Sequence, residues 1–207
     1  MRIISAQNFI NGITKKIRFD KIISMKNTHE TTSIHFSTQL FEINSWTILK
    51  LPEEISKKLP SRALTMIEGT MNGVSFKSVL EPDGRGSHWF KVDNELLKKA
   101  SAQERDTVKM EIWTTKEWVE PEVPEDFKKA LVNSPKEYAL WKDITPNARW
   151  DWIRWIRAVK TTETRQKHIE VALDKLNKGM RRPCCFNRNL CSDPTVSHNW
   201  VLLSPTT

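Results

Sequence analysis

Residues 145–179 read TPNARWDWIRWIRAVKTTETRQKHIEVALDKLNKG, and this stretch predicts two consecutive helices. Thr145 suits the N-cap of the first helix, and Pro146 suits its first position, where a missing backbone N–H costs nothing. The second helix repeats apolar residues at helical spacing, and Gly179 supplies its C-terminal stop; the repeated residues are Ile169, Ala172, Leu173 and Leu176. The C-terminal half of the chain is therefore predicted to be helical.

The first of these helices is apolar almost all the way round. Such a helix is expected to be buried against several neighbours. We expect Trp155 and Ile156 to be buried where it packs on the helix that ends at Gly179, with Arg154 and Arg157 along the rim. Three indoles within six residues cannot all face one way, so at least one is expected near the surface; the three are Trp150, Trp152 and Trp155.

The N-terminal half shows the alternation of apolar and polar residues that is typical of strands. After Leu40 the alternation shifts phase, as a bulge would produce. The pair Asn72-Gly73 is a strong signal for a two-residue hairpin turn. Six strands are predicted, and closing them into a small, partly closed β-barrel would remove exposed edges; they cover residues 33–43, 46–51, 64–71, 74–80, 88–92 and 108–113.

These patterns predict an α+β fold, in which a six-stranded small β-barrel with short helices precedes a C-terminal α-helical domain. A pseudo-repeat supports the barrel, since residues 51–59 and 92–100 each place a short acidic-to-basic helical turn after a strand. Two prolines and three glutamates mark an extended linker between the halves. The predicted parts are a disordered or spurious extension (1–32), the barrel (33–116), the linker (117–124), the helical domain (125–180) and a Cys-containing tail (181–207).

The net charge of +8 is concentrated at the two ends of the chain. Residues 1–32 carry six basic and two acidic residues, and residues 148–207 carry eleven and five. Residues 33–118 are neutral, with twelve of each sign. No apolar run approaches the roughly 20 residues that cross a bilayer, and the N-terminus lacks the pattern of a secretion signal. We therefore expect a cytoplasmic protein; whether translation starts at Met1 or Met25 stays open.

The three cysteines predict neither a disulfide framework nor a metal site. Cys184, Cys185 and Cys191 are an odd number, and an odd set near one end is typical of a reducing compartment. Adjacent cysteines do not match the spacing of a zinc knuckle, even with His198 downstream. No metal and no cofactor are expected.

Two sets of residues resemble known families. Residues 155–158 (WIRA) and 160–165 (KTTETR), followed by the amphipathic helix to Gly179, resemble the bacteriocin-protection family, also called YdeI/OmpD-associated. The N-terminal half resembles the small barrel domain of unknown function that often precedes it, through Leu51-Pro52, Glu68-Gly69-Thr70, Asn72-Gly73 and Gly86-Ser87-His88-Trp89. The resemblance implies a role in bacteriocin tolerance and envelope association, and it carries over no catalytic or ligand site.

Residues 81–89, EPDGRGSHW, have two readings. One is a hairpin turn in which glycines supply unusual backbone angles. The other is the mouth of a small-ligand site at the barrel end, with Arg85, His88 and Trp89 as contacts.

An enzyme would need acids that converge, or an activated nucleophile. The sequence does not place Glu68, Glu81 and Asp83 together, and no G-x-S-x-G nucleophile elbow is present. Catalytic residues are therefore not assigned.

Indoles interleaved with arginines in the first C-terminal helix suggest nucleic-acid binding through stacking and phosphate contacts. The candidates are Arg149, Arg154, Arg157 and Trp155. The other reading is that the tryptophans are core and the arginine stems cover them.

Three functions follow from these readings. We expect a non-enzymatic bacterial binding or interaction protein of the bacteriocin-protection or stress-tolerance type, with an unidentified protein partner or small ligand. The alternatives are a nucleic-acid-binding protein and an enzyme with a site at the barrel mouth.

Overall fold

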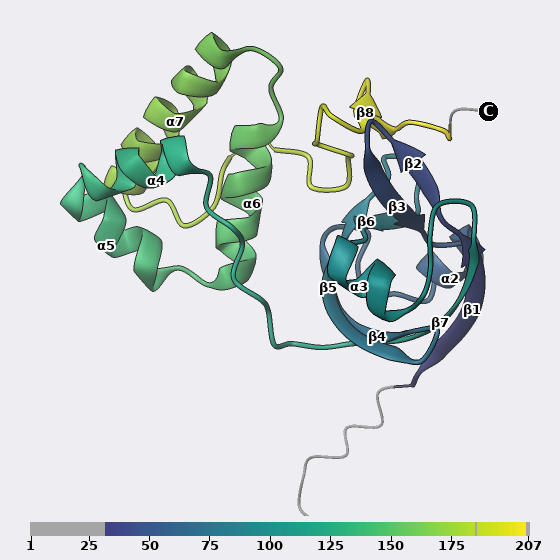
Figure 1. The fold of residues 1–207 in the computed structure, drawn as a ribbon. Helices are drawn as coiled ribbons and strands as arrows, with labels where there is room; N and C mark the ends of the chain where they lie inside the picture. The colour runs from purple at the N-terminus through teal and green to yellow at the C-terminus, as the bar shows by residue number, and fades with distance from the viewer. Residues whose placement is uncertain (1–31, 185, 206–207) are drawn as a thin grey trace, which may run out of the picture. The chain divides into compact units, whose positions relative to one another are not determined.

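The computed structural model describes residues 32–184 and 186–205, which form a curled antiparallel sheet, a group of helices and a short C-terminal hairpin (Figure 1). The fold is α+β, as the sequence predicts. The expectation of a disordered or spurious extension falls almost entirely on residues 1–31, which lie outside the described residues, so it stays a prediction.

Seven antiparallel strands make up the sheet, in the order β1-β7-β4-β5-β6-β3-β2. Their bounds are β1 (Ile34–Gln39), β2 (Phe41–Ile43), β3 (Trp46–Lys50), β4 (Thr65–Met71), β5 (Val74–Pro82), β6 (His88–Lys91) and β7 (Thr107–Thr114). The predicted hairpin joins β4 to β5. Asn72 and Gly73 both have positive φ, 49° and 84°, as a type I′ turn requires.

The predicted strand number and barrel closure are corrected by the structure. The first predicted strand divides at Leu40 into β1, which pairs with β7, and β2, which pairs with β3 at the opposite edge of the sheet. The backbone of Leu40 bonds instead to the loop before β7, with its N–H 2.9 Å from the Asp106 carbonyl oxygen. Near this division the Thr38 hydroxyl donates to the Lys50 carbonyl oxygen at 3.0 Å. The sheet therefore curls strongly without closing into a hydrogen-bonded barrel.

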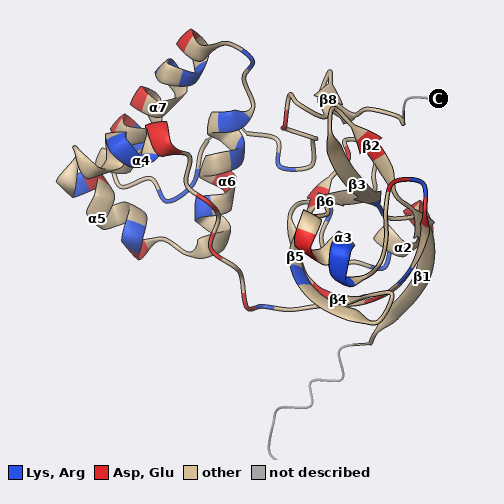
Figure 2. Ribbon diagram, in the orientation of Figure 1, with Lys and Arg blue, Asp and Glu red and all other residues tan. Residues whose placement is uncertain are grey.

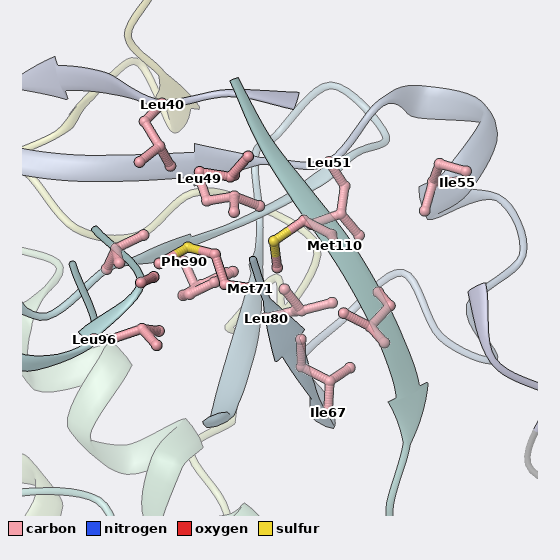
Figure 3. Close-up of a cluster of buried hydrophobic side chains, with 14 of the residues drawn as sticks. Leu40, Leu49, Leu51, Ile55, Ile67, Met71, Leu80, Phe90, Leu96 and Met110 are labelled. Atoms are coloured by element: carbon pink, nitrogen blue, oxygen red, sulfur yellow. The ribbon is translucent and has the colours of Figure 1, made fainter. Parts of the chain in front are cut away.

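The concave side of the sheet holds the larger hydrophobic core (Figure 3). Two short helices, α2 (Glu53–Ser56) and α3 (Asn94–Lys99), add apolar residues to it. The pseudo-repeat explains how, because equivalent positions of its two copies enter the same core; they are Leu51, Ile55 and Leu59 in one copy and Val92, Leu96 and Ala100 in the other. Asp93 begins α3 as a side-chain cap that accepts from the Leu96 N–H at 2.7 Å.

Four longer helices form a second core. They are α4 (Glu125–Val132), α5 (Pro135–Asp143), α6 (Pro146–Arg157) and α7 (Thr162–Asn177). Thr145 caps α6 as predicted, accepting from the Ala148 N–H at 3.3 Å. No helix in the described part of the chain is long and apolar enough to span a membrane.

The expected burial of the α6 apolar residues is confirmed for Ile156, which is fully buried, whereas Trp155 is half-buried. The Trp155 ring stacks on His168 of α7, with centroids 4.1 Å apart and planes within 9°. Lys175 Nζ lies 5.1 Å from the same ring. Trp155 therefore belongs to the α6–α7 interface.

The C-terminal segment, predicted as a Cys-containing tail, contains a hairpin of β8 (Ser197–His198) and β9 (Val201–Leu202). Leu202 packs with Cys191 and Val196 against the sheet residues Ile48 and Trp89. The segment is thus part of the folded protein.

Gly84 shows how closely this hairpin approaches the sheet. A Cβ at Gly84 would lie 2.1 Å from the Trp200 carbonyl oxygen, and its φ is +80°. Gly86 in the same loop also has positive φ, +96°, but a Cβ at that position would meet no atom within 4 Å.

We expect Gly84→Ala to lower the free energy of unfolding by about 1–3 kcal/mol more than Gly86→Ala does. Both changes carry the left-handed backbone penalty of about 1–2 kcal/mol, and only the first also displaces the hairpin. Urea denaturation of the two variants measures the difference. Equal losses would contradict the close packing of β8–β9 on this loop.

Candidate ligand-binding site

Alternation along the strands places a mixed set of side chains on the outer face of the sheet. Lys77, Val79 and Glu81 share one face of β5, and the pairing of Glu81 with Trp89 puts Trp89 and Lys91 of β6 on the same face. These side chains, with Trp46 of β3, line one side of a cavity of about 580 Å³.

The opposite side of this cavity comes from α6 and from the chain leading to α4. Trp150, Ile153 and Arg157 recur at i, i+3 and i+7, so they share one face of α6. Val119 and Glu122 contribute from the connecting segment. We call this cavity, with its lining, the cleft.

Beside the cleft lies a buried charge cluster, formed by Glu81, Arg154, Arg157 and Asp193. Glu81 is 7% exposed, and its carboxylate pairs with Arg157 and lies 3.3 Å from Arg154 Nε. Arg157 Nε lies 3.5 Å from Asp193 Oδ2. The cluster therefore joins β5, α6 and the C-terminal segment.

Arg154 is anchored further by the C-terminal segment. Its two terminal nitrogens donate to the carbonyl oxygens of Arg188 at 3.3 Å and Leu190 at 2.8 Å. Its guanidinium also lies 5.3 Å from the centroid of the Phe186 ring. Every one of these contacts comes from residues more than thirty positions away in sequence.

The prediction that Arg154 lies along a rim is therefore wrong, whereas the partly exposed Arg157 does not contradict it. Arg154 is completely buried, and Arg157 is 22% exposed. Arginines on a helix usually lie at the surface because an unpaired buried charge is costly. Here a carboxylate from β5 pairs with both arginines, and carbonyl groups from the C-terminal segment accept from Arg154. The only sign of this cluster in the sequence is an acidic residue, Glu81, at the end of an apolar strand. Such a residue does not reveal which basic side chain pairs with it.

The cluster determines the ionisation of Glu81. Burial alone would raise the pKa of Glu81, but the positive charges of Arg157 and Arg154 outweigh it, so the pKa lies below its ordinary value of 4.5. Glu81 is thus held as a carboxylate at neutral pH.

The structure separates the three residues predicted for a ligand mouth. Trp89 lines the cleft, whereas Arg85 lines a second cavity of about 610 Å³ near the division between β1 and β2. His88 is fully buried, with Nδ1 2.6 Å from Ser56 Oγ and Nε2 3.0 Å from the Ala63 carbonyl oxygen. Burial lowers the pKa of His88. The three do not line a common cavity, and ligand binding by Arg85 stays a prediction.

The loop between β5 and β6, which carries Arg85, is organised by Asp83. Its Oδ1 accepts from the backbone N–H groups of Arg85 at 2.7 Å and Ser87 at 2.8 Å, and its Oδ2 pairs with Lys50 at 2.8 Å. Burial raises the pKa of Asp83, but these donors lower it more, so it stays ionised. Asp83 therefore stabilises the loop, as expected if residues 81–89 form a hairpin turn.

Each of the acids considered for catalysis forms an ion pair with a basic side chain. Glu68 pairs with Lys77 at 2.8 Å, Glu81 with two arginines, and Asp83 with Lys50. The contact between Ser56 and His88 has the elements of a nucleophile and a base, but both side chains are completely buried. We assign them a packing role.

Among the described residues, Cys184, Cys191 and His198 are not brought together as ligands. Cys191 is buried in the sheet–hairpin cluster, and burial raises the pKa of its thiol to about 12. Lys175 Nζ lies 2.9 Å from Cys184 Sγ. Within residues 32–184 and 186–205, no group of three or more His, Cys, Asp or Glu side chains could hold a metal ion; Cys185 lies outside that part.

The residues proposed for nucleic-acid binding make internal contacts. Arg149 pairs with both carboxylate oxygens of Glu120 and donates to the Trp141 and Ile144 carbonyl oxygens. Arg154 and Arg157 belong to the charge cluster, and Trp155 to the α6–α7 interface. These contacts favour the reading in which these side chains stabilise the fold.

We expect Arg154→Ala to lower the free energy of unfolding by about 3–5 kcal/mol, because it leaves Glu81 buried with one partner fewer. Arg181→Ala is the matched control, since its side chain is 53% exposed and pairs only with the exposed Asp143, so its loss should cost less than about 1 kcal/mol. Chemical denaturation measures both. A small loss for Arg154→Ala would restore the rim position inferred from sequence.

The lowered pKa of Glu81 predicts an acid-sensitive fold. The stability that its charge contributes is complete above pH 4.5 and is lost as the pH falls through the lower pKa of the folded state. Free energies of unfolding measured from about pH 6 down to about pH 3 should fall less steeply for Glu81→Gln than for the wild type. Glu163→Gln makes the same charge change at an exposed position and serves as the control. Parallel curves for wild type and Glu81→Gln would contradict this assignment.

Comparison with known families agrees with the division seen in the structure. Residues 36–112 match the Domain of unknown function (DUF1905), which covers most of the curled sheet. Residues 120–179 match the family described as Bacteriocin-protection, YdeI or OmpD-Associated, which covers α4 to α7. No curated protein matches the chain. Both resemblances inferred from sequence are confirmed: the chain contains a region that matches a domain of unknown function, followed by a helical region that matches the bacteriocin-protection, YdeI or OmpD-associated family.

Proposed function

We propose that this protein is a non-enzymatic binding protein of the bacteriocin-protection or stress-tolerance type, and that the cleft is its ligand site. The observation that carries the proposal is the cavity of about 580 Å³, which three indoles and several charged side chains line together. Small-molecule sites are typically concave, mostly apolar and of about 300–1,000 Å³, with a few polar groups. The indoles are Trp46, Trp89 and Trp150.

The walls of the cleft support a preformed site. Glu81 and Arg157 line it and also belong to the buried charge cluster, so their positions are fixed without a ligand. Trp150 Nε1 donates to the Val119 carbonyl oxygen at 2.9 Å, which holds the indole against the connecting segment. A preformed site loses less conformational entropy on binding.

A binding role suits this geometry better than catalysis. Glu81 is the more buried of the two acids that line the cleft, and two arginines keep it ionised, which makes it a poor proton donor near neutral pH. The nucleic-acid alternative is less favoured, because its arginines are paired with Glu81, Asp193 and Glu120.

The proposal includes the domain organisation and the setting. We infer a sheet domain over residues 33–116, a linker over 117–124 and a helical domain over 125–180, with the linker contributing Val119 and Glu122 to the cleft. The odd number of cysteines favours a reducing, cytoplasmic setting.

Filling the cleft should abolish ligand binding. Val119 is half-buried and lines the cleft, so Val119→Trp places an indole in the cavity while keeping the backbone carbonyl that Trp150 uses. Val132→Trp is the control, because Val132 is 57% exposed on α4. In a thermal-shift screen of a metabolite library, we expect hits that raise the melting temperature of the wild type and of Val132→Trp by a few degrees, and not that of Val119→Trp.

Two outcomes would overturn the proposal. One is that Val119→Trp keeps the same hits, which would place binding outside the cleft. The other is that the library gives no hit and native mass spectrometry of the purified protein shows no bound small molecule.

A further inference from the structure

We propose that the cleft takes a flat aromatic compound carrying a single negative charge, such as an aromatic carboxylate, and that Lys91 holds that charge. This inference rests on the proposed function and names its ligand class. It follows from two properties of the lining, the state of its indoles and the pairing of its charges.

Two of the three indoles in the cleft, those of Trp46 and Trp150, offer accessible ring surface. The Trp89 and Trp150 N–H groups are both used internally, by the Pro82 carbonyl oxygen at 3.2 Å and the Val119 carbonyl oxygen at 2.9 Å. Trp46 and Trp150 are half-buried, so part of each ring remains accessible. Rings of this kind recognise flat aromatic groups through stacking and edge contacts.

Three cations line the cleft, and two of them are already neutralised. Lys77 lies 2.8 Å from Glu68 Oε1 and 3.4 Å from Glu117 Oε2. Arg157 is shared between Glu81 and Asp193. Lys91 is different, because no carboxylate in the described part of the chain forms an ion pair with it.

Lys91 stands next to an aromatic wall. Its Nζ lies 4.2 Å from the centroid of the Trp46 ring. A ligand whose ring packs near Trp46 would bring an attached anionic group within reach of this ammonium. Such an arrangement adds an ion pair to aromatic contact, and the pair gains strength where protein partly excludes water.

The acids of the cleft limit the ligand to one negative charge. Glu122 lines the cavity and has no ion pair with the described residues, so a second anionic group would face an uncompensated carboxylate. It lies on the segment between β7 and α4, which carries several acidic residues (Figure 2). Like charges at close range cost binding free energy. Nucleotides with doubly charged phosphates are therefore disfavoured relative to aromatic monocarboxylates.

Calorimetric titration with three probes tests the ligand class on the full chain. Indoleacetate has the ring and one negative charge, indole has the ring alone, and adenosine monophosphate carries a phosphate of higher charge. We expect indoleacetate to bind the wild type about tenfold or more tightly than either of the others, as a charged hydrogen-bonded contact should provide.

Lysine variants locate the charge. Lys91 is exposed, so Lys91→Ala should fold normally and bind indoleacetate no more tightly than indole. Lys91→Arg should keep the preference. Lys98→Ala is the matched control, since Lys98 is an exposed lysine on α3 outside the cleft, and it should bind as the wild type does.

The ligand class is overturned if indole or adenosine monophosphate binds as tightly as indoleacetate, or if Lys91→Ala leaves the preference unchanged. It is also overturned if no probe binds while other library compounds give hits that Val119→Trp abolishes; in that case the proposed function stands. If no compound gives hits that Val119→Trp abolishes, the proposed function itself fails.

Discussion

The buried carboxylate of Glu81 is the constraint on which the rest of the cleft depends. Glu81 lies near the C-terminal end of β5, and its negative charge is balanced by two guanidinium groups from α6. A carboxylate transferred from water into protein without partners would cost several kcal/mol. Separating β5 from α6 would therefore break this ion pair at a large cost in free energy. Because Glu81 and Arg157 also line the cleft, the same pairing determines the distance between its two sides.

The loop that follows Glu81 extends this constraint to other parts of the chain. Asp83 pairs with Lys50 of β3, and its carbonyl oxygen accepts from the Leu202 N–H of β9 at 2.9 Å. His88 bonds to Ser56 of α2. One short loop thus connects a strand, a helix and the C-terminal hairpin. The partners of its polar residues are distant along the chain, so the sequence does not reveal them. The same residues therefore resemble ligand contacts when only the sequence is considered.

Local features of the fold could be predicted from sequence because their causes are local. The Thr145 cap, the Asn72-Gly73 turn and the strand alternation each depend on residues within a few positions of one another. The division at Leu40 was not predictable in this way. Alternation continues on both sides of Leu40 with a shifted phase, and the partner strand changes from β7 to β3. A phase shift in a sequence indicates an irregularity in the strand, but it does not show which edge of the sheet each segment joins.

The candidate site was harder to predict for the same reason. The sequence singled out Trp89, which does line the cleft, but it grouped Trp89 with Arg85 and His88, its neighbours in the chain. Neighbours in a strand point to opposite faces, so His88 faces inward to Ser56 while Trp89 faces the cleft. The partners of Trp89 in space are Trp46 and Trp150, which lie more than forty and sixty positions away. Only the pairing of strands, and the charge cluster that holds α6, brings them together.

The same alternation decides which residues could adapt the cleft to a ligand. On β5, Phe76 and Leu80 belong to the core on one face, while Val79 and Glu81 serve the other. Glu81 and Arg157 are held by the charge cluster, and Val79 packs in a buried cluster with Leu64 and Met66. Changing any of them would disturb the fold before it altered specificity. Lys91 and Glu122 are exposed and form no ion pair within the described residues, so they can change without such a cost. Specificity for charge can therefore vary at the mouth of the cleft while its walls stay fixed by packing.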